Sequence, residues 1–320
     1  MNRPYIIFEV TPRCNSKCLY CYNVWKQNNK YPKGELNLDS IKSLFKNISA
    51  EIKPKFITLS GGEPLLRQDI FEIIDFLKES GNKIGIATNG TLLNEEKINA
   101  LIQSGIEYFE ISLNSTNPKT YSRLSMNKHL EKVRQAVLSV KKHKVPLTVS
   151  FTITKLNYTD VEDVIDLCFA FSVDSVALNR FVPGDEGIQN LQTLQISQPE
   201  LETTLRMADQ KSAQYKIPIN ITIPIETCEI DHKKYPHLNF GTCGCGLHKW
   251  VIDPQGNLRT CEQNPEILGS LFDNNFIELS NLDEVKTFRK NNARLLCGKC
   301  LSFKNCGGGC RFLERARTEI

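Results

Sequence analysis

The sequence lacks the features of a membrane, secreted or disordered protein. It has no run of about 18 uninterrupted apolar residues, the length that crosses a bilayer, and residues 1–20 lack the apolar core of a signal peptide. It contains no low-complexity segment, and 40% of its 320 residues are hydrophobic. That content is enough for one large domain, or for a large and a small one. We therefore expect a globular cytoplasmic protein with no membrane partner.

Concentrated charge is also missing. The 40 Lys and Arg residues stand against 36 Asp and Glu, and the net charge of +4 is spread along the chain rather than gathered in blocks. Nucleic-acid binding favours a clustered basic surface, so the sequence predicts no nucleic-acid partner. The five histidines show no metal-ligand spacing.

Cysteine is the residue that the chain has in excess. Three of the twelve cysteines lie between residues 14 and 21, seven follow residue 242, and only Cys168 and Cys228 stand alone. Disulfides are rare in the reducing cytoplasm, so clustered thiolates there indicate bound metal. Soft thiolate ligands select zinc or iron–sulfur clusters over hard cations.

Short apolar runs alternate with amphipathic helical patterns over the first two thirds of the chain. The candidate strands are Tyr5–Val10, Phe56–Leu59, Ile84–Thr88, Tyr108–Leu113, Leu147–Thr154 and Ser175–Leu178. The candidate helices include Ile70–Lys78, Glu95–Gln103, Leu130–Lys142 and Val161–Phe171, and Asp39-Ser40 is expected to precede the first helix. Six such units predict right-handed βαβ crossovers and a parallel sheet, but are too few for a closed eight-unit barrel. We expect an α/β fold, a partial TIM-like (β/α)6 barrel.

The pattern changes after about residue 195. The later candidates are a long helix, a strand and a hairpin: Gln198–Tyr215, Ile219–Pro224, and Trp250–Ile252 with Leu258–Thr260. We expect three parts: a core domain over residues 1–195, a connecting helix and strand over residues 196–240, and a small cysteine-rich, metal-dependent domain over residues 241–320.

The first cysteine group, Cys14-x3-Cys18-x2-Cys21, directly follows the first expected strand. Three thiolates on one loop converge on one centre if the loop curls around it. Three ligands leave one iron of a four-iron cluster open to coordinate a substrate or cofactor. On spacing alone, a zinc loop without its fourth ligand is the alternative.

Together with two downstream motifs, this group resembles the radical S-adenosylmethionine (SAM) superfamily. The three cysteines match the family's CxxxCxxC signature, its GGEP motif stands at residues 61–64 and its TNG motif at residues 88–90. Each element ends an expected strand, where parallel α/β folds place ligand sites. The resemblance covers residues 5–185. It implies that a [4Fe–4S] cluster on the three cysteines donates one electron to SAM, and that the resulting 5′-deoxyadenosyl radical abstracts hydrogen from the substrate.

The resemblance also implies which residues contact SAM. Gly61, Gly62 and Glu63 would meet its methionyl amino group, and Tyr20 would lie beside the adenine. Arg123 is placed like the family's carboxylate-binding arginine, since a guanidinium grips a carboxylate with two hydrogen bonds; a surface arginine is the alternative. The remaining candidate contacts are Thr88, Asn89, Ser112, Asn114, Ser150 and Leu178, of which Leu178 also fits a place in the hydrophobic core.

The C-terminal cysteines resemble the SPASM extension, a domain that carries auxiliary iron–sulfur clusters. The matching spacings are CX2CX5CX3C from residue 297 and GX4C from residue 256, with further cysteines upstream. With the first group, the metal-ligand candidates are Cys14, Cys18, Cys21, Cys243, Cys245, Cys261, Cys297, Cys300, Cys306 and Cys310.

How these C-terminal cysteines share ligands stays open. In one arrangement, a single auxiliary [4Fe–4S] cluster is ligated by Cys243, Cys245, Cys261 and Cys310. The remaining three then lack a fourth ligand, because the family's last cysteine is missing. Alternatively, the last four cysteines bind one cluster together, as in a twitch-like domain. We expect one or two auxiliary [4Fe–4S] clusters, with a structural zinc ribbon as the alternative.

SPASM-type enzymes mostly act on peptides or proteins, often ribosomally made peptides, so the resemblance implies such a substrate and an electron donor such as flavodoxin or ferredoxin. Crosslinking through a thioether or a carbon–carbon bond is a net oxidation. Epimerisation instead needs a hydrogen donor, such as a thiol, on the opposite face of the α-carbon. No separate leader-binding domain is expected before the first strand, so a peptide would dock on the barrel mouth and the C-terminal part.

Two cysteines outside both groups bear on the choice of reaction. Cys228 is the candidate hydrogen donor, with a cluster ligand or an inert thiol as alternatives, and the acids around it are expected to form a solvated loop. Cys168 stands in an apolar helical pattern and is expected to be a core thiol. The chain resembles small peptide epimerases, so we expect L-to-D epimerisation of a ribosomally made peptide. A crosslinking maturase and a non-enzymatic Fe–S or zinc carrier are the alternatives.

Overall fold

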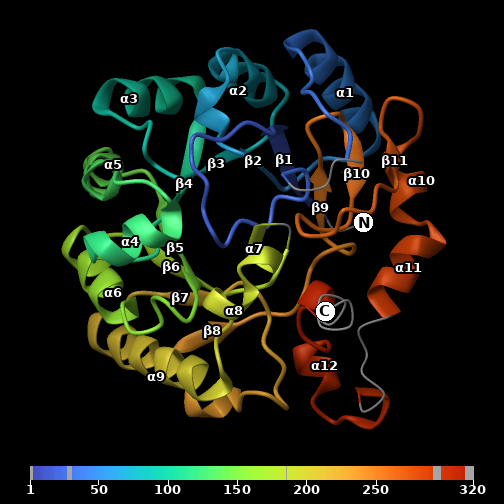
Figure 1. Cartoon of the computed structure of the whole chain (residues 1–320). Coiled ribbons are helices and arrows are strands. Elements are labelled where there is room, and N and C mark those ends of the chain that lie inside the picture. The colour runs from blue at the N-terminus through green and yellow to red at the C-terminus, as the bar shows by residue number, and fades with distance from the viewer. Residues whose placement is uncertain (1–2, 27–30, 185, 291–296, 314–320) are drawn as a thin grey trace.

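The computed structural model describes residues 3–26, 31–184, 186–290 and 297–313. Its strands form one eleven-stranded sheet in the order β11-β10-β9-β1-β2-β3-β4-β5-β6-β7-β8. Neighbouring strands from β1 to β6 pair in parallel, and the sheet curves into an arc with helices outside it (Figure 1). The expected α/β, TIM-like fold is confirmed.

The strands of the arc are β1 (Tyr5–Thr11), β2 (Phe56–Gly61), β3 (Ile84–Thr88), β4 (Ile106–Ser112), β5 (Leu147–Ile153) and β6 (Ser175–Arg180). The helices that follow them are α1 (Leu38–Glu51), α2 (Ile70–Glu79), α3 (Glu95–Ser104), α4 (Pro118–Ser125), α5 (Leu130–Lys142) and α6 (Val161–Ala170). All six expected strands are present, each with bounds within two residues of the prediction. The N-cap of α1 differs: Asn37 accepts the backbone N–H of Ser40 at 2.9 Å, so Asp39 and Ser40 lie in the first helical turn.

The other helices are α7 (Glu186–Gln189), α8 (Leu191–Leu194), α9 (Gln198–Tyr215), α10 (Phe276–Ser280), α11 (Asp283–Lys290) and α12 (Phe303–Cys306), with 3-10 turns at Pro64–Leu66, His232–Lys234 and Cys297–Lys299. The other strands are β7 (Ile219–Ile221), β8 (Leu238–Phe240), β9 (Lys249–Ile252), β10 (Asn257–Arg259) and β11 (Gly269–Ser270). β9 and β10 form the expected antiparallel hairpin. Because β9 pairs in parallel with β1, the cysteine-rich segment lies directly beside the first strand of the arc.

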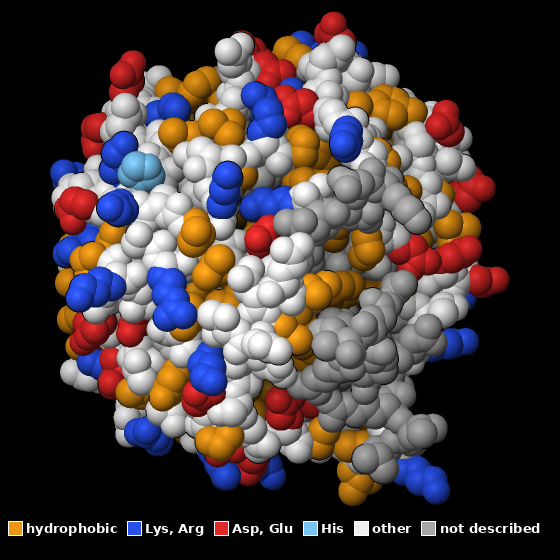
Figure 2. All heavy atoms as spheres, viewed as in Figure 1, with side chains coloured by type: hydrophobic (Ala, Val, Ile, Leu, Met, Phe, Trp, Pro, Cys, Tyr) orange, Lys and Arg blue, Asp and Glu red, His pale blue; other side chains and the backbone are white. Residues whose placement is uncertain are grey.

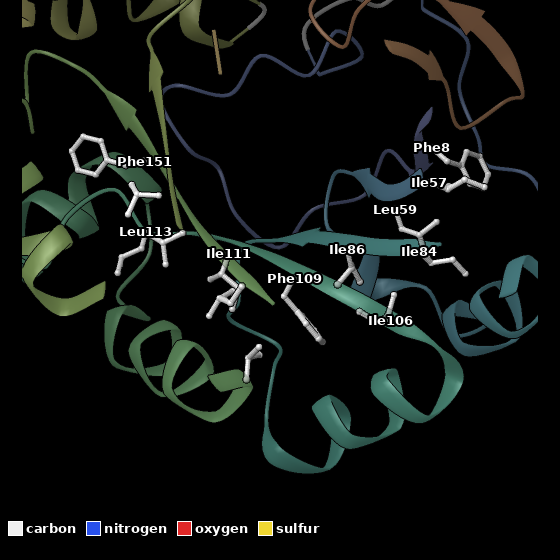
Figure 3. Packing of buried hydrophobic residues seen from close by; sticks show 14 of the residues in the cluster. Phe8, Ile57, Leu59, Ile84, Ile86, Ile106, Phe109, Ile111, Leu113 and Phe151 are labelled. Carbon is white, nitrogen blue, oxygen red and sulfur yellow. The ribbon is translucent and has the colours of Figure 1, made fainter. Parts of the chain in front are cut away.

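Successive side chains along each strand point to opposite faces of the sheet, one toward the hydrophobic core and the other toward the interior of the arc. Side chains such as Ile57, Ile86 and Phe109 pack between the strands and the surrounding helices (Figure 3). Their neighbours Thr58, Ala87 and Glu110 line a cavity inside the arc instead. Each fully buried Ile, Leu or Phe contributes about 1.5–3 kcal/mol, so the outer face stabilises the fold while the inner face is left for polar groups.

The surface carries charges of both signs. Figure 2 shows Lys and Arg side chains interspersed with Asp and Glu over the face in view, in keeping with the small net charge. Among the described residues, no helix is both long enough and apolar enough to cross a membrane.

Candidate cofactor and cluster site

The first cysteine group lies on the loop after β1, inside the arc (Figure 1). The backbone N–H of Leu19 donates to the carbonyl of Leu124 at 2.9 Å, at the end of α4. On the other side, the N–H of Gly187 in α7 donates to the carbonyl of Cys21 at 3.2 Å. The loop is therefore held from both sides, and its three cysteines are each partly exposed.

The three thiols of this loop lie within electrostatic range of one another. Burial raises the pKa of Cys18 to about 12, and the ammonium of Lys26 hydrogen-bonds to Cys21. Because an iron ligand must be a thiolate, binding of a cluster here releases protons. Three neighbouring thiols beside a lysine suit an anionic iron–sulfur cluster with three protein ligands.

The GGEP motif packs tightly against the residues that precede Cys14. The N–H of Gly62 donates to the carbonyl of Thr11, and the N–H of Glu63 to the carbonyl of Arg13, both at 2.7 Å. A Cβ on residue 62 would lie 2.1 Å from the carbonyl oxygen of Arg13. Only glycine fits there, so the motif fixes where the cysteine loop begins.

Glu63 is fully buried, and its carboxylate joins two motifs. It accepts hydrogen bonds from Thr88 Oγ1 at 2.7 Å, the N–H of Asn89 at 2.8 Å and the N–H of Leu65 at 3.2 Å. Burial raises the pKa of Glu63, an effect these hydrogen bonds oppose. Asn89 also donates from Nδ2 to Asn15 Oδ1 at 2.8 Å, so the TNG motif contacts the cysteine loop directly.

The candidate serines occupy neighbouring places on the inner face. Ser112 and Ser150 are partners in the β4–β5 register. Ser150 Oγ accepts from Asn179 Nδ2 at 3.0 Å and hydrogen-bonds to Glu110. Asn114 is buried just beyond β4, and its Oδ1 accepts the N–H of Thr152 at 2.6 Å.

Two other candidate SAM contacts, Leu178 and Arg123, differ from these serines in burial and position. The side chain of Leu178 is fully buried in the core and pairs in register with Phe151, on the helix-facing side of the sheet. A contact from Leu178 to adenosine would therefore have to come from its backbone, because the inner face at this point belongs to its neighbours. Arg123 is exposed on α4, and it forms no ion pair with any carboxylate among the described residues.

One cavity of about 440 Å³ joins the first cysteine loop to the C-terminal cysteines. It is lined by Tyr20 and Tyr22 of the loop and by inner-face residues that include Glu110. Four cysteines also line it: Cys243, Cys245, Cys261 and Cys310. The size lies in the range of about 300–1,000 Å³ that small-molecule sites occupy.

The four wall cysteines fit a metal centre. The ligand atoms of Cys245, Cys261 and Glu262 all lie within 4.8 Å of one another. Hydrogen bonding from Cys245, together with the nearby charge of Arg311, lowers the pKa of Cys243 to about 5. Cys245 also hydrogen-bonds to both Cys243 and Cys261, and such neighbouring soft thiols suit zinc or an iron–sulfur cluster. Of the other three C-terminal cysteines, Cys306 is buried, Cys297 partly exposed and Cys300 exposed.

Charged side chains around the cavity are paired across distant elements. Arg180 at the end of β6 bonds to Glu226 at 2.8 Å and to Glu229 at 3.0 Å. Glu226 is buried, so the expectation of a solvated acidic loop was wrong at this residue: the buried guanidinium requires a carboxylate. Lys249 bonds to Glu262 at 2.7 Å, and that carboxylate raises the pKa of Lys249 against the effect of burial.

A second buried ion pair ties β1 to the cysteine-rich segment. Arg259 is fully buried and pairs with Glu9 on β1. It also donates to the carbonyl of Asn264 at 2.9 Å, and its guanidinium lies 5.6 Å from the ring centre of Tyr31. The sequence motifs gave no signal for Arg259 or Arg180, because each partner lies far away along the chain.

The two remaining cysteines differ in burial. Cys168 is fully buried in the core, and burial raises its pKa, as expected of a core thiol. Cys228 is exposed and does not line the cavity, although Pro224, earlier in the same segment, does.

Comparisons with known proteins bear on the family and the fold of this chain. Residues 8–168 match the Radical SAM superfamily. The AdoMet-dependent heme synthase of Methanosarcina barkeri (strain Fusaro / DSM 804) is 28% identical over 338 residues, which cover 99% of this chain and 94% of that protein.

Two solved structures have a similar fold. The structure of anSMEcpe with bound AdoMet gives a TM-score of 0.75 at 18% identity and covers 99% of this chain and 92% of that one. Streptococcus suis SuiB bound to S-adenosylmethionine gives a TM-score of 0.74 at 16% identity, covering 96% and 73% of the two chains. At these identities the likeness concerns the fold.

Proposed function

This chain belongs to the radical SAM superfamily, and we propose that it modifies a ribosomally made peptide held between its two groups of cysteines. Its cofactors are SAM and [4Fe–4S] clusters. When bound, they supply a 5′-deoxyadenosyl radical able to abstract hydrogen from an unactivated carbon. The observation that carries the proposal is one cavity that is lined both by Tyr20 and Tyr22 of the first cysteine loop and by four C-terminal cysteines.

In this proposal the core over residues 1–195 binds SAM and the domain over residues 241–320 binds the auxiliary cluster, with residues 196–240 connecting them. The iron ligands of the first cluster are Cys14, Cys18 and Cys21. The proposed SAM contacts are Tyr20, Gly61, Gly62, Glu63, Thr88, Asn89, Ser112, Asn114, Arg123, Ser150 and Leu178, the last through its backbone. These groups orient the cofactor, while the apolar and aromatic lining limits the access of water to the reacting carbon.

A peptide substrate is supported by the neighbouring folds. Among the structures similar to this one, SuiB is bound to the precursor peptide SuiA and anSMEcpe to a Cp18Cys peptide. The finer reaction that we propose is L-to-D epimerisation, with Cys228 as the hydrogen donor. Its support is that Cys228 is exposed and follows the cavity-lining Pro224 in the same segment, whereas Cys168, the other cysteine outside both groups, is fully buried in the core. A thioether or carbon–carbon crosslink is the competing peptide reaction.

The test uses anaerobically reconstituted protein, SAM, a reductant and peptides translated from short reading frames beside its gene, all in deuterated water. Epimerisation predicts a gain of one mass unit in a peptide with wild type. The Cys228→Ala variant should retain its iron and still cleave SAM without producing that gain, whereas the matched control Cys168→Ala should produce it. A loss of two mass units with wild type would instead identify a crosslink.

A second candidate is the modification of a tetrapyrrole. It is favoured by the relationship to the heme synthase, which extends over nearly the whole chain rather than the core alone. Porphyrin precursors of heme, incubated under the same conditions, distinguish the two. A mass change in a porphyrin, with none in any peptide, would replace the peptide proposal.

A further inference from the structure

Five basic side chains lie at the cavity or support its cysteines, and two of them differ from the rest. Arg180, Lys249 and Arg259 each form an ion pair with a carboxylate. Arg289 and Arg311 form none with any carboxylate in the described part of the chain. Their hydrogen-bond partners there are backbone carbonyls.

The two unpaired guanidinium groups lie together at the cysteine segment. Arg289, near the end of α11, donates from Nη1 to the carbonyls of Cys243 at 2.8 Å and Cys245 at 3.0 Å. Arg311 donates from Nη1 to the carbonyl of Arg289 at 2.5 Å and from Nη2 to that of Gly307 at 3.2 Å. A carbonyl satisfies the N–H donors of a guanidinium but does not cancel its charge.

Placing these two guanidinium charges side by side without a carboxylate destabilises the folded state unless another anion lies nearby. Arg311 is buried and follows Cys310 directly, and its Nε has no hydrogen-bond partner among the described residues. Arg289 is partly buried beside it. Two like charges in such surroundings repel each other and lose hydration. An oxidised [4Fe–4S] core with four thiolate ligands carries a formal charge of about −2, which would balance both.

We propose that Arg289 and Arg311 balance the charge of an auxiliary [4Fe–4S] cluster and raise its reduction potential. The cluster is the one ligated by Cys243, Cys245, Cys261 and Cys310. Reduction adds one negative charge to the cluster, and nearby positive charge stabilises the reduced form more than the oxidised one. The inference rests on this cluster and not on the identity of the substrate, so it applies to a peptide or a tetrapyrrole alike.

The test isolates the auxiliary iron in the full chain. Cys14→Ala, Cys18→Ala and Cys21→Ala together remove the ligands of the first cluster and give the parent protein. Arg289→Gln and Arg311→Gln are then compared in this parent with Arg289→Lys, which keeps the charge. A matched control is Lys286→Gln on the same helix, because the exposed Lys286 is already paired with Asp283 at 2.7 Å. Iron and sulfide are counted, and the midpoint potential is measured by EPR-monitored reduction with dithionite.

We expect both glutamine variants to keep their iron and to shift the midpoint potential to more negative values, while Arg289→Lys and Lys286→Gln match the parent. Loss of auxiliary iron in Arg289→Gln but not in Arg289→Lys would also support a role for the charge. Unchanged potentials in both glutamine variants, or loss of iron in Arg289→Lys as well, would overturn the inference. A parent without auxiliary iron would overturn it too. That result would not bear on the separate proposal that the first cluster of the wild-type protein cleaves SAM.

Discussion

Replacing Gly62 with alanine tests how the GGEP motif holds the first cysteine loop in place. The added Cβ would lie 2.1 Å from the carbonyl oxygen of Arg13 and 2.5 Å from its carbonyl carbon. Real Cβ atoms essentially never approach within 3.0 Å of such atoms, so one backbone segment must move by about 0.9 Å. The segment that moves lies immediately before Cys14.

The energetic cost follows from the packing and the hydrogen bonds. Overpacking costs about 1–3 kcal/mol, and each weakened hydrogen bond adds about 0.5–1.5 kcal/mol. The backbone hydrogen bonds that would weaken are those from Gly62 to Thr11 and from Glu63 to Arg13. The total of about 2–6 kcal/mol lies at or below the low end of the stability of most domains, about 5–15 kcal/mol, so the variant should fold but melt at a lower temperature.

The assay is iron content after anaerobic reconstitution, together with the melting temperature. We expect Gly62→Ala to lose most of the iron of the first cluster, because its cysteine loop no longer begins in the right place. Gly241→Ala is the control, since its Cβ would meet its nearest neighbour only at 3.9 Å. Wild-type iron content and melting temperature in Gly62→Ala would refute the reasoning.

Three further predictions concern single side chains. Arg259→Met should cost about 3–5 kcal/mol in urea unfolding, because it leaves Glu9 buried without its partner; a change below about 1 kcal/mol would contradict the ion pair. Burial lowers the pKa of His232, whose ring centre lies 3.9 Å from that of Phe240. The unfolded chain therefore binds more protons than the folded one, and the free energy of unfolding falls as the pH drops below about 6.5. His232→Phe should flatten the fall in melting temperature between about pH 7.5 and 5.5, and equal slopes would count against this role. Arg123→Gln should weaken SAM binding about tenfold in calorimetry without loss of iron, whereas an unchanged Kd would make Arg123 a surface residue.

Much of the arc could be predicted because each strand or helix has a recognisable local sequence pattern. Ile84–Thr88 and Leu130–Lys142 have the predicted bounds, since an apolar run or an amphipathic stripe ends there at a turn or a change of period. The motifs at residues 61–64 and 88–90 were also visible, because each is a short local signature. The structure adds that the two motifs meet at the buried carboxylate of Glu63, because β2 and β3 are neighbouring parallel strands.

Features that depend on register or on distant partners could not be predicted in this way. Leu178 faces the helices because of where β6 begins, and a shift of one residue would reverse its face. The pair of Arg180 and Glu226 joins residues 46 positions apart, and that of Arg259 and Glu9 joins residues 250 apart. Neither pair leaves a local pattern, so they emerge only when the fold brings β6 to the segment around Glu226 and β1 to the cysteine-rich segment.

Formation of 5′-deoxyadenosine from SAM, with dithionite as the reductant, tests most directly whether the Cys14–Cys21 loop holds a SAM-cleaving cluster. We predict that wild type and Cys168→Ala form this product and that Cys18→Ala does not, because the loop then offers two ligands instead of three. Full iron loading of wild type with no 5′-deoxyadenosine, or equal formation by Cys18→Ala, would contradict the proposed chemistry.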